Sequence, residues 1–199
     1  MEKHDCPTHR VYEVEQKYYA RDINELLARL EQLAMEEHAQ EHHQDIYFRH
    51  PSRNFRETDE ALRIRVLGDR ACVTYKGPRL AGPVKTRPEI ELDIRSSETE
   101  HWSEMYQHLG FTIAAEVRKT RRIFQPRPGV QVVGNGPIVV ALDDVEQLGS
   151  FAEIEQIVSD PNELETAKET IQDVASRLGL AEVQPVSYLG MLLAKLGIE

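Results

Sequence analysis

The sequence predicts an α+β protein that is mainly β: a closed, eight-stranded antiparallel barrel, or tunnel, with helices packed outside it. Three observations favour this fold class. Short segments with alternating side chains follow one another through turns rich in Gly, Pro and Asn. No βαβ alternation interrupts them, which argues against a parallel sheet. Charged residues occupy one face of strand after strand, so these faces would line a wet interior while helices cover the aliphatic faces.

The size and composition of the chain fit a single domain that covers residues 1–199. Hydrophobic residues make up 40% of the chain and charged residues 29%, so we expect a packed core under a heavily charged surface. No apolar run approaches the length of a membrane span, and no signal peptide is visible. Cys6 and Cys72 give neither a disulfide framework nor a zinc-ligand spacing. We therefore expect a cytoplasmic protein that does not bind a membrane.

The net charge of −10 is distributed unevenly along the chain. The segment 49–127 holds 16 Lys and Arg against 11 Asp and Glu, whereas the remainder holds 8 against 23. A basic middle between acidic flanks can concentrate a small anionic ligand at one site while the whole molecule remains acidic. No continuous basic helix or RNA-binding signature accompanies it, so extended nucleic acid is not expected as a partner.

The first strand is expected at residues 11–17, where charged side chains recur at every second position. Glu13, Glu15 and Lys17 would share one face, because successive side chains of a strand point to opposite sides. Two neighbouring carboxylates raise each other's pKa unless a positive charge lies between them. Their oxygens suit a hard cation such as Mg²⁺ or Mn²⁺. Taken alone, the pattern is equally compatible with a solvent-facing strand that binds no metal.

A helix is expected from Asp22, which is a suitable N-cap, to about Glu37, because leucines at helical spacing follow the cap. Three histidines come next, at His38, His42 and His43. Their spacing is compatible with a metal site, but a solvated helix end is the favoured interpretation.

The middle of the chain is expected to form strands separated by turn residues. Arg63 and Arg65 share one face of their strand, opposite three aliphatic residues. Pro88 cannot donate a hydrogen bond to a neighbouring strand, so we expect an edge or a bulge there. The expected strands are 45–48, 62–66, 71–76 and 84–94, and a helix follows at 97–109.

The last strands raise a question of register. A strand at 112–124 carries Lys119 and Arg121 on one face and Arg118 and Arg122 on the other, and a shift of one residue would exchange the two pairs. Both assignments therefore stay open. A hairpin is expected to pair 130–133 with 138–143 across Gly134-Asn135-Gly136, followed by a strand at 149–155 and amphipathic helices at 162–178 and 187–196.

The charged faces together predict a site for a triphosphate chain with a divalent metal. Arg binds phosphoryl oxygens as a bidentate fork and Lys binds them as a point charge. Carboxylates hold Mg²⁺ through a few direct ligands and leave positions for substrate. Unrelated surface ion pairs would not keep the same parity over six strands. The acids are Glu13, Glu15, Glu89, Glu91, Asp143, Glu153 and Glu155, and the bases are Lys17, Arg63, Arg65, Lys76, Lys85, Arg87, Lys119 and Arg121.

The segment Glu13-Val14-Glu15-Gln16-Lys17 is similar to the ExExK signature of the CYTH family, also called triphosphate tunnel metalloenzymes. The resemblance covers nearly the whole chain, and within the family it is greatest to the bacterial class IV adenylyl cyclases. It continues through Leu62-Arg63-Ile64-Arg65, Tyr75-Lys76-Gly77, Glu89-Ile90-Glu91, Lys119-Thr120-Arg121, Leu142-Asp143 and Phe151-Ala152-Glu153-Ile154-Glu155; the cyclase subgroup is indicated by 45–48, 56–63, 75–78 and 85–87.

The resemblance implies an eight-stranded tunnel and a homodimer. It also implies an adenylate cyclase that converts ATP to cyclic AMP and pyrophosphate with Mg²⁺ or Mn²⁺. The catalytic residues would be Glu13, Glu15, Lys17, Lys76 and Lys119. The metal ligands would be Glu13, Glu15, Asp143, Glu153 and Glu155, and the phosphate-binding residues would be Arg63, Arg65, Lys76, Lys85, Arg87, Lys119 and Arg121.

Two other functions stay open. A metal-dependent triphosphatase acting on thiamine triphosphate, inorganic triphosphate or a nucleoside triphosphate would use the same residues, with water attacking the terminal phosphorus. In the cyclase, the ribose 3′-hydroxyl attacks the α-phosphorus instead. A regulatory module that binds polyphosphate without turnover is disfavoured, because binding an anion alone does not need so many carboxylates.

Overall fold

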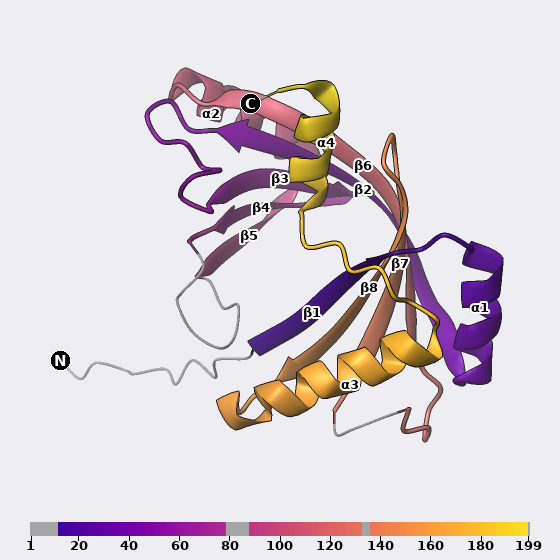
Figure 1. Cartoon of the computed structure of the whole chain (residues 1–199). Coiled ribbons are helices and arrows are strands. Elements are labelled where there is room, and N and C mark those ends of the chain that lie inside the picture. Colours follow the sequence, from indigo (N-terminus) through magenta and orange to yellow (C-terminus); the bar gives the residue numbers. More distant parts are fainter. Residues whose placement is uncertain (1–11, 79–87, 133–135, 199) are drawn as a thin grey trace.

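The computed structural model describes residues 12–78, 88–132 and 136–198, which form one eight-stranded sheet with helices against it (Figure 1). Every strand pair in it is antiparallel, which confirms the prediction of a mainly β, antiparallel protein. The order across the sheet is β1-β8-β7-β6-β2-β3-β4-β5. The strands are β1 (Tyr12–Tyr19), β2 (Met35–Arg49), β3 (Ala61–Leu67), β4 (Arg70–Lys76), β5 (Glu89–Arg95), β6 (Thr112–Pro126), β7 (Ile138–Val145) and β8 (Gly149–Val158). The α-helices are α1 (Ile23–Gln32), α2 (Thr99–His108), α3 (Leu164–Arg177) and α4 (Tyr188–Leu196), and the short 3₁₀ helices η1 (Ser96–Glu98) and η2 (Pro161–Glu163) precede α2 and α3.

The prediction that the sheet closes into a barrel is wrong. Strands β1 and β5 are its two edges, and no pairing joins them within the described residues. Figure 1 shows a strongly bent sheet in which β1 and β5 stay apart. The charges near the two edges do not decide closure, because Lys76 on β4 lowers the pKa of Glu13 on β1 whereas Glu89 on β5 raises it. The alternation that suggested a barrel is the same in an open, bent sheet.

The strand register places the charged residues on one face of the sheet, as their alternation predicts. Lys17 lies opposite Glu153 across β1 and β8, and Arg121 lies opposite Asp143 across β6 and β7. We call this side the charged face. It carries Glu13, Glu15, Lys17, Asp45, Arg63, Arg65, Lys76, Glu89, Glu91, Lys119, Arg121, Asp143, Glu153 and Glu155.

The structure also decides the register of β6 that the sequence left open. Lys119 and Arg121 lie on the charged face, where both form ion pairs with Asp143. Arg118 and Arg122 lie on the opposite face and pair with glutamates near the protein surface.

The opposite, aliphatic face of the sheet is covered by helices. Val14 and Ile154 from the strands pack with Leu30 of α1 and Ile171 of α3 in the largest hydrophobic cluster. A second cluster forms under α2, where Trp102 packs against a group of buried residues from β2, β3 and β4. These contacts confirm that the sheet's aliphatic side is covered by amphipathic helices.

Helix α4 departs from the expectation that all helices lie on the aliphatic side. Tyr188 and Leu192 pack against Val117, Val145 and Phe151, which have the same strand parity as the charged residues. The C-terminal helix therefore covers an apolar section at one end of the charged face. In Figure 1 it crosses in front of the bent sheet.

The predicted helix from Asp22 is shorter than expected. The Asp22 side chain accepts a hydrogen bond from the Glu25 amide at 2.9 Å, as predicted for an N-cap, but α1 ends at Gln32. Ala34 then adopts a left-handed conformation with φ of +54°, and β2 begins at Met35. The long pairing of β2 with β6 outweighs the local helical pattern. The three histidines therefore lie on a strand and not at a helix end.

Two further boundaries differ from the prediction. Strand β5 begins at Glu89, and the residues 84–87 expected to precede it lie outside the described residues. The prediction of a hairpin between 130–133 and 138–143 is wrong. The partners of β7 are β6 on one side and β8 on the other. Residues 133–135 of the expected hairpin also lie outside the described residues.

Candidate functional site

The acidic end of the charged face is formed by β1 and β8. These strands pair directly, which places Glu15 opposite Glu155. The glutamates of the first strand and those of the last strand therefore meet as predicted, although they meet through neighbouring strands and not through closure of a barrel. Partial burial, followed by the charges of Glu15 and Glu155, raises the pKa of Glu13 to about 7. The pKa of Glu155 is also raised, chiefly by burial.

Asp143 lies at the centre of the basic part of the charged face. It accepts hydrogen bonds from Lys119 Nζ at 2.9 Å and from Arg121 Nε and Nη2 at 2.7 and 2.6 Å. The Tyr188 hydroxyl donates a further bond at 2.8 Å. Although burial acts in the opposite direction, these donors hold the pKa of Asp143 well below its usual range. The structure thus brings Asp143 to bases, and Glu153 likewise contacts Arg121.

A second carboxylate organises the arginines of β3. Asp45 accepts two hydrogen bonds from Arg65, each at 2.6 Å, and its Oδ2 lies 3.5 Å from Arg63 Nη1. The Arg63 Nε–H is buried without a hydrogen-bond partner among the described residues, so this donor is available to a ligand oxygen. Asp45 was not among the predicted site residues.

The opposite edge of the charged face contributes Lys76. Its Nζ lies 2.8 Å from Glu89 Oε1, and Thr74 donates a hydrogen bond to Glu91 at 2.9 Å. The remaining predicted bases, Lys85 and Arg87, lie outside the described residues.

Lys17 and Lys119 both lie close to the ring of Tyr188, with Nζ 4.2 and 5.0 Å from the ring centroid. Burial lowers the pKa of Lys17, and burial together with Arg121 lowers that of Lys119 to about 8. Sequence reasoning missed Tyr188, since a tyrosine at the start of a C-terminal helix resembles an ordinary core residue.

The histidines of β2 do not form a joint metal site. His42 and His43 are neighbours on a strand and point to opposite faces: His42 lies 3.1 Å from Thr120 Oγ1, whereas His43 Nε2 lies 2.8 Å from Glu41. Burial, with the nearby Arg65, lowers the pKa of His43 to about 4, so its imidazole is neutral at pH 7.

The glutamates of β1 and β8 suit a hard divalent cation, although they do not supply a complete set of metal ligands. Among the described residues, no three His, Cys, Asp or Glu side chains converge closely enough to hold a metal ion by themselves. Mg²⁺ does not need three, because it binds through one or two carboxylates and completes its shell with water and phosphate. The raised pKa of Glu13 indicates that the row of Glu13, Glu15 and Glu155 is short of positive charge, so these residues fit such an ion.

Comparison with known proteins shows the family. The model of the CYTH domain matches residues 11–188. A protein of Methanocaldococcus jannaschii, named as a candidate adenylate cyclase, is 36% identical over 170 residues, which cover 85% of this chain and 91% of the relative. Adenylate cyclase CyaB of Aeromonas hydrophila is 28% identical over 176 residues, which cover 87% of this chain and 83% of that protein. The chain belongs to the CYTH family, as the resemblance of its motifs suggested.

The solved structures agree with this assignment. The structure of the PH1819 protein from Pyrococcus horikoshii has a TM-score of 0.77 and 37% sequence identity to this chain. The similar region covers 92% of this chain and 99% of that protein. In addition, no helix among the described residues is both long and apolar enough to span a membrane.

Proposed function

We propose that the protein is a class IV-type adenylate cyclase, which converts ATP to cyclic AMP and pyrophosphate with the help of Mg²⁺ or Mn²⁺. The observation that carries the proposal is the charged face: three partly buried arginines and the buried Lys119, from β3 and β6, lie on the same face as a row of carboxylates on β1 and β8. Two relatives with names that include adenylate cyclase support the choice of reaction.

The basic residues would bind the triphosphate chain. Arg63 has an unused buried Nε–H donor, and Arg65 and Arg121 are held by carboxylates in defined orientations. Guanidinium groups fixed in this way lose little conformational entropy when they bind phosphoryl oxygens. Lys76 and Lys119 would add point charges. Lys85 and Arg87 remain expected contributors from the sequence alone.

The acidic row would hold the metal through Glu13, Glu15 and Glu155. Bound there, the ion would neutralise phosphate charge and lower the pKa of the attacking hydroxyl. Glu153 and Asp143 would act mainly by orienting Arg121 and Lys119, since they contact these bases. Lys17, at the junction between acidic and basic residues, would contact phosphate.

In the proposed reaction, the ribose 3′-hydroxyl gives its proton to water and its oxygen forms a bond to the α-phosphorus, while the bond from the α-phosphorus to the oxygen that bridges it to the β-phosphate breaks. Pyrophosphate leaves with its charge balanced by the lysines and arginines of the charged face. Positioning and electrostatic stabilisation dominate this type of catalysis, so the protein needs no covalent intermediate.

One observation favours the triphosphatase as a second candidate. Among the described residues no strand pairing joins β1 to β5, and Glu13 and Glu15 are exposed, so water can reach these carboxylates. Water attacking the terminal phosphorus would release inorganic phosphate from the same set of residues.

Product analysis separates these functions. The protein is incubated with MgATP and, in parallel, with MnATP, and the products are identified by ³¹P NMR and chromatography. Cyclic AMP with pyrophosphate is the expected result. Formation of a nucleoside diphosphate and inorganic phosphate would contradict the cyclase and support the triphosphatase. Tight nucleotide binding without any product would contradict both enzymes and support a binding module.

A further inference from the structure

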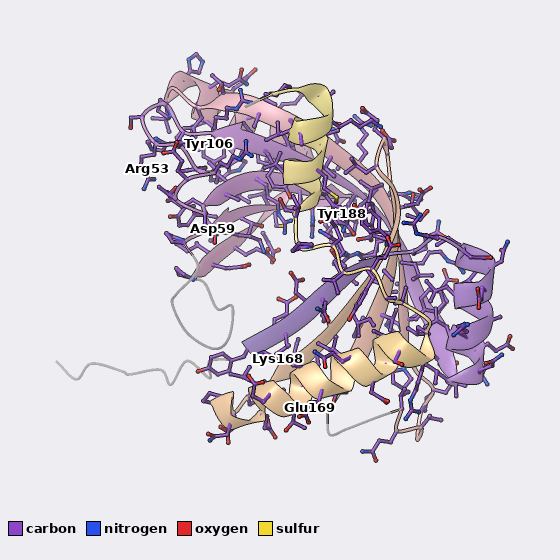
Figure 2. The ribbon with its side chains drawn as sticks, in the orientation of Figure 1. Arg53, Asp59, Tyr106, Lys168, Glu169 and Tyr188 are labelled. Atoms are coloured by element: carbon purple, nitrogen blue, oxygen red, sulfur yellow. The ribbon has the colours of Figure 1, made fainter. Side chains whose placement is uncertain are left out.

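Tyr188 lies at the first turn of α4, where the C-terminal helix meets the charged face. The preceding Ser187 caps the helix by accepting a hydrogen bond from the Gly190 amide at 3.1 Å. Tyr188 and Leu192 anchor α4 in the apolar cluster with Phe151. Figure 2 shows Tyr188 beside the strands where α4 begins. Helix capping and apolar packing thus fix the ring independently of any ligand.

The ring and hydroxyl of Tyr188 contact three charged groups. Its hydroxyl donates to Asp143 Oδ2 at 2.8 Å, and Nζ of Lys17 and Nζ of Lys119 lie 4.2 and 5.0 Å from its ring centroid. Burial and the nearby carboxylates Glu153 and Asp143 raise the pKa of this phenol. Its proton therefore stays in place as the donor to Asp143.

An aromatic ring holds an ammonium group differently from a carboxylate. A carboxylate at ion-pair distance offsets much of the charge of a lysine, whereas the ring face attracts the cation without adding a negative charge. Lys119 has both kinds of contact, since its Nζ also lies 2.9 Å from Asp143 Oδ2, and carboxylates such as Glu153 act on Lys17 only at longer range. In the part of the chain that the structure describes, no carboxylate forms an ion pair with Lys17. Lys17 is thus oriented by the ring while its hydrogen-bond donors remain open. The attraction of each ammonium group to the ring face partly offsets the repulsion between the two lysines.

We propose that Tyr188 is a positioning residue that holds Lys17 and Lys119, as charged donors, at the place where the phosphate chain binds. The inference rests on the proposed function, because it assigns these lysines to phosphate. It extends that function by making the C-terminal helix α4 part of the binding site and not only a structural cover.

The test compares three variants of the full chain. Tyr188→Phe keeps the ring but removes the donor to Asp143, and Tyr188→Leu removes both. Leu192→Ala is the matched control, because Leu192 is buried in the same cluster on the same helix. Affinity for inorganic tripolyphosphate is measured by calorimetry, and KM and kcat are measured with MgATP. Ring-current shifts of the lysine Cε protons are recorded by NMR, and thermal unfolding reports stability.

We expect Tyr188→Leu to weaken tripolyphosphate binding about tenfold, as the loss of two cation–π contacts implies. Two lysine signals displaced upfield in the unmodified protein should return to ordinary positions in this variant and remain displaced in Tyr188→Phe. Leu192→Ala should lower the unfolding temperature but retain the displaced signals and the affinity. KM should rise in Tyr188→Leu more than in Leu192→Ala.

Equal affinities of Tyr188→Leu and the unmodified protein would overturn the inference, and so would an equal loss of affinity in Leu192→Ala. If Tyr188→Leu does not fold, the unmodified protein decides the question: tripolyphosphate must shift the two displaced lysine signals. An unmodified protein that binds no tripolyphosphate would contradict the proposed function, and with it this role, whatever the lysine signals show.

Discussion

Glu15 provides the most direct test of the acidic row at the scale of single residues. Replacing it with Gln keeps the volume of the side chain but removes a charge and a strong metal ligand. We expect turnover to fall by about 100-fold or more, with little loss of stability in the absence of metal, because repulsion from Glu155 is relieved. Steady-state kinetics with Mg²⁺ and Mn²⁺ check this result. Glu165→Gln, at an exposed position of α3, should be unchanged.

Glu153→Gln is a companion variant with a different mechanism. Because Glu153 contacts Arg121, its loss should also lower activity, while the apparent affinity for metal changes less than in Glu15→Gln. If Glu15→Gln and Glu153→Gln both kept full metal-dependent activity, the metal would not bind at β1 and β8.

Glu13 predicts a pH dependence of stability. Its pKa in the folded protein is about 7, above the 4.5 of the unfolded chain, so its contribution to stability is present below pH 4.5 and is lost as the pH rises through 7. In metal-free buffer, Glu13→Gln should therefore gain stability relative to the unmodified protein between pH 5 and 8. Allowing for solvent screening, the gain is of order 1 kcal/mol, or about 2–4 °C.

Thermal unfolding of both proteins across this pH range measures the difference. Saturating Mg²⁺ should reduce it, because the cation favours the ionised carboxylate. A difference that does not vary with pH would show that Glu13 does not titrate near neutrality in the folded state.

Strand β2 is the element that the sequence described least well. Its histidines and glutamates at 36–43 followed a leucine-rich helical pattern, and only the pairing with β6 makes them a strand. Because leucines at helical spacing extend the predicted helix to Glu37, the strand alternation of this segment is hidden, and the sequence does not place Glu41 and His43 on the charged face. Asp45 was within a predicted strand, but a single aspartate gives no signal of its partners until Arg63 and Arg65 are placed beside it.

Asp45 gives β2 a testable role in holding β3. Asp45→Ala would leave Arg63 and Arg65 buried without their carboxylate, which we expect to cost about 3–5 kcal/mol of unfolding free energy. Glu37→Ala is the control on the same strand, because it breaks the more exposed pair with Arg122 and should cost less than about 1 kcal/mol. Chemical denaturation measures both values. Equal costs would mean that Asp45 does not organise these arginines.

At the scale of the whole molecule, the sequence predicted the antiparallel class, the charged face and a segment within each of the eight strands, together with a further segment at 130–133 whose described residues are not a strand. These follow from alternation, which any half-buried strand must obey. Closure could not be predicted in this way, because it depends on whether β1 and β5 meet over a long distance in sequence. The position of α4 on the charged side was also invisible, since an amphipathic helix does not specify which sheet face it covers.

The homodimer expected from the resemblance stays a prediction. Light scattering at micromolar concentration should give twice the mass of the chain, about 46 kDa, from the 22.8 kDa of one copy. A monomer would remove this expectation without affecting the charged face.

The central claim is that the charged face binds and converts a triphosphate, and neighbouring residues of β6 test it directly. Arg121 lies on the charged face, whereas Arg122 lies on the opposite face and pairs with Glu37. The measurement is kcat/KM for MgATP in Arg121→Gln and Arg122→Gln, with cyclic AMP quantified as the product. The account predicts a loss of at least about tenfold to 100-fold in Arg121→Gln, as expected for a charge-assisted hydrogen bond, and less than about twofold in Arg122→Gln. Equal activity of the two variants, or a greater loss in Arg122→Gln, would contradict it.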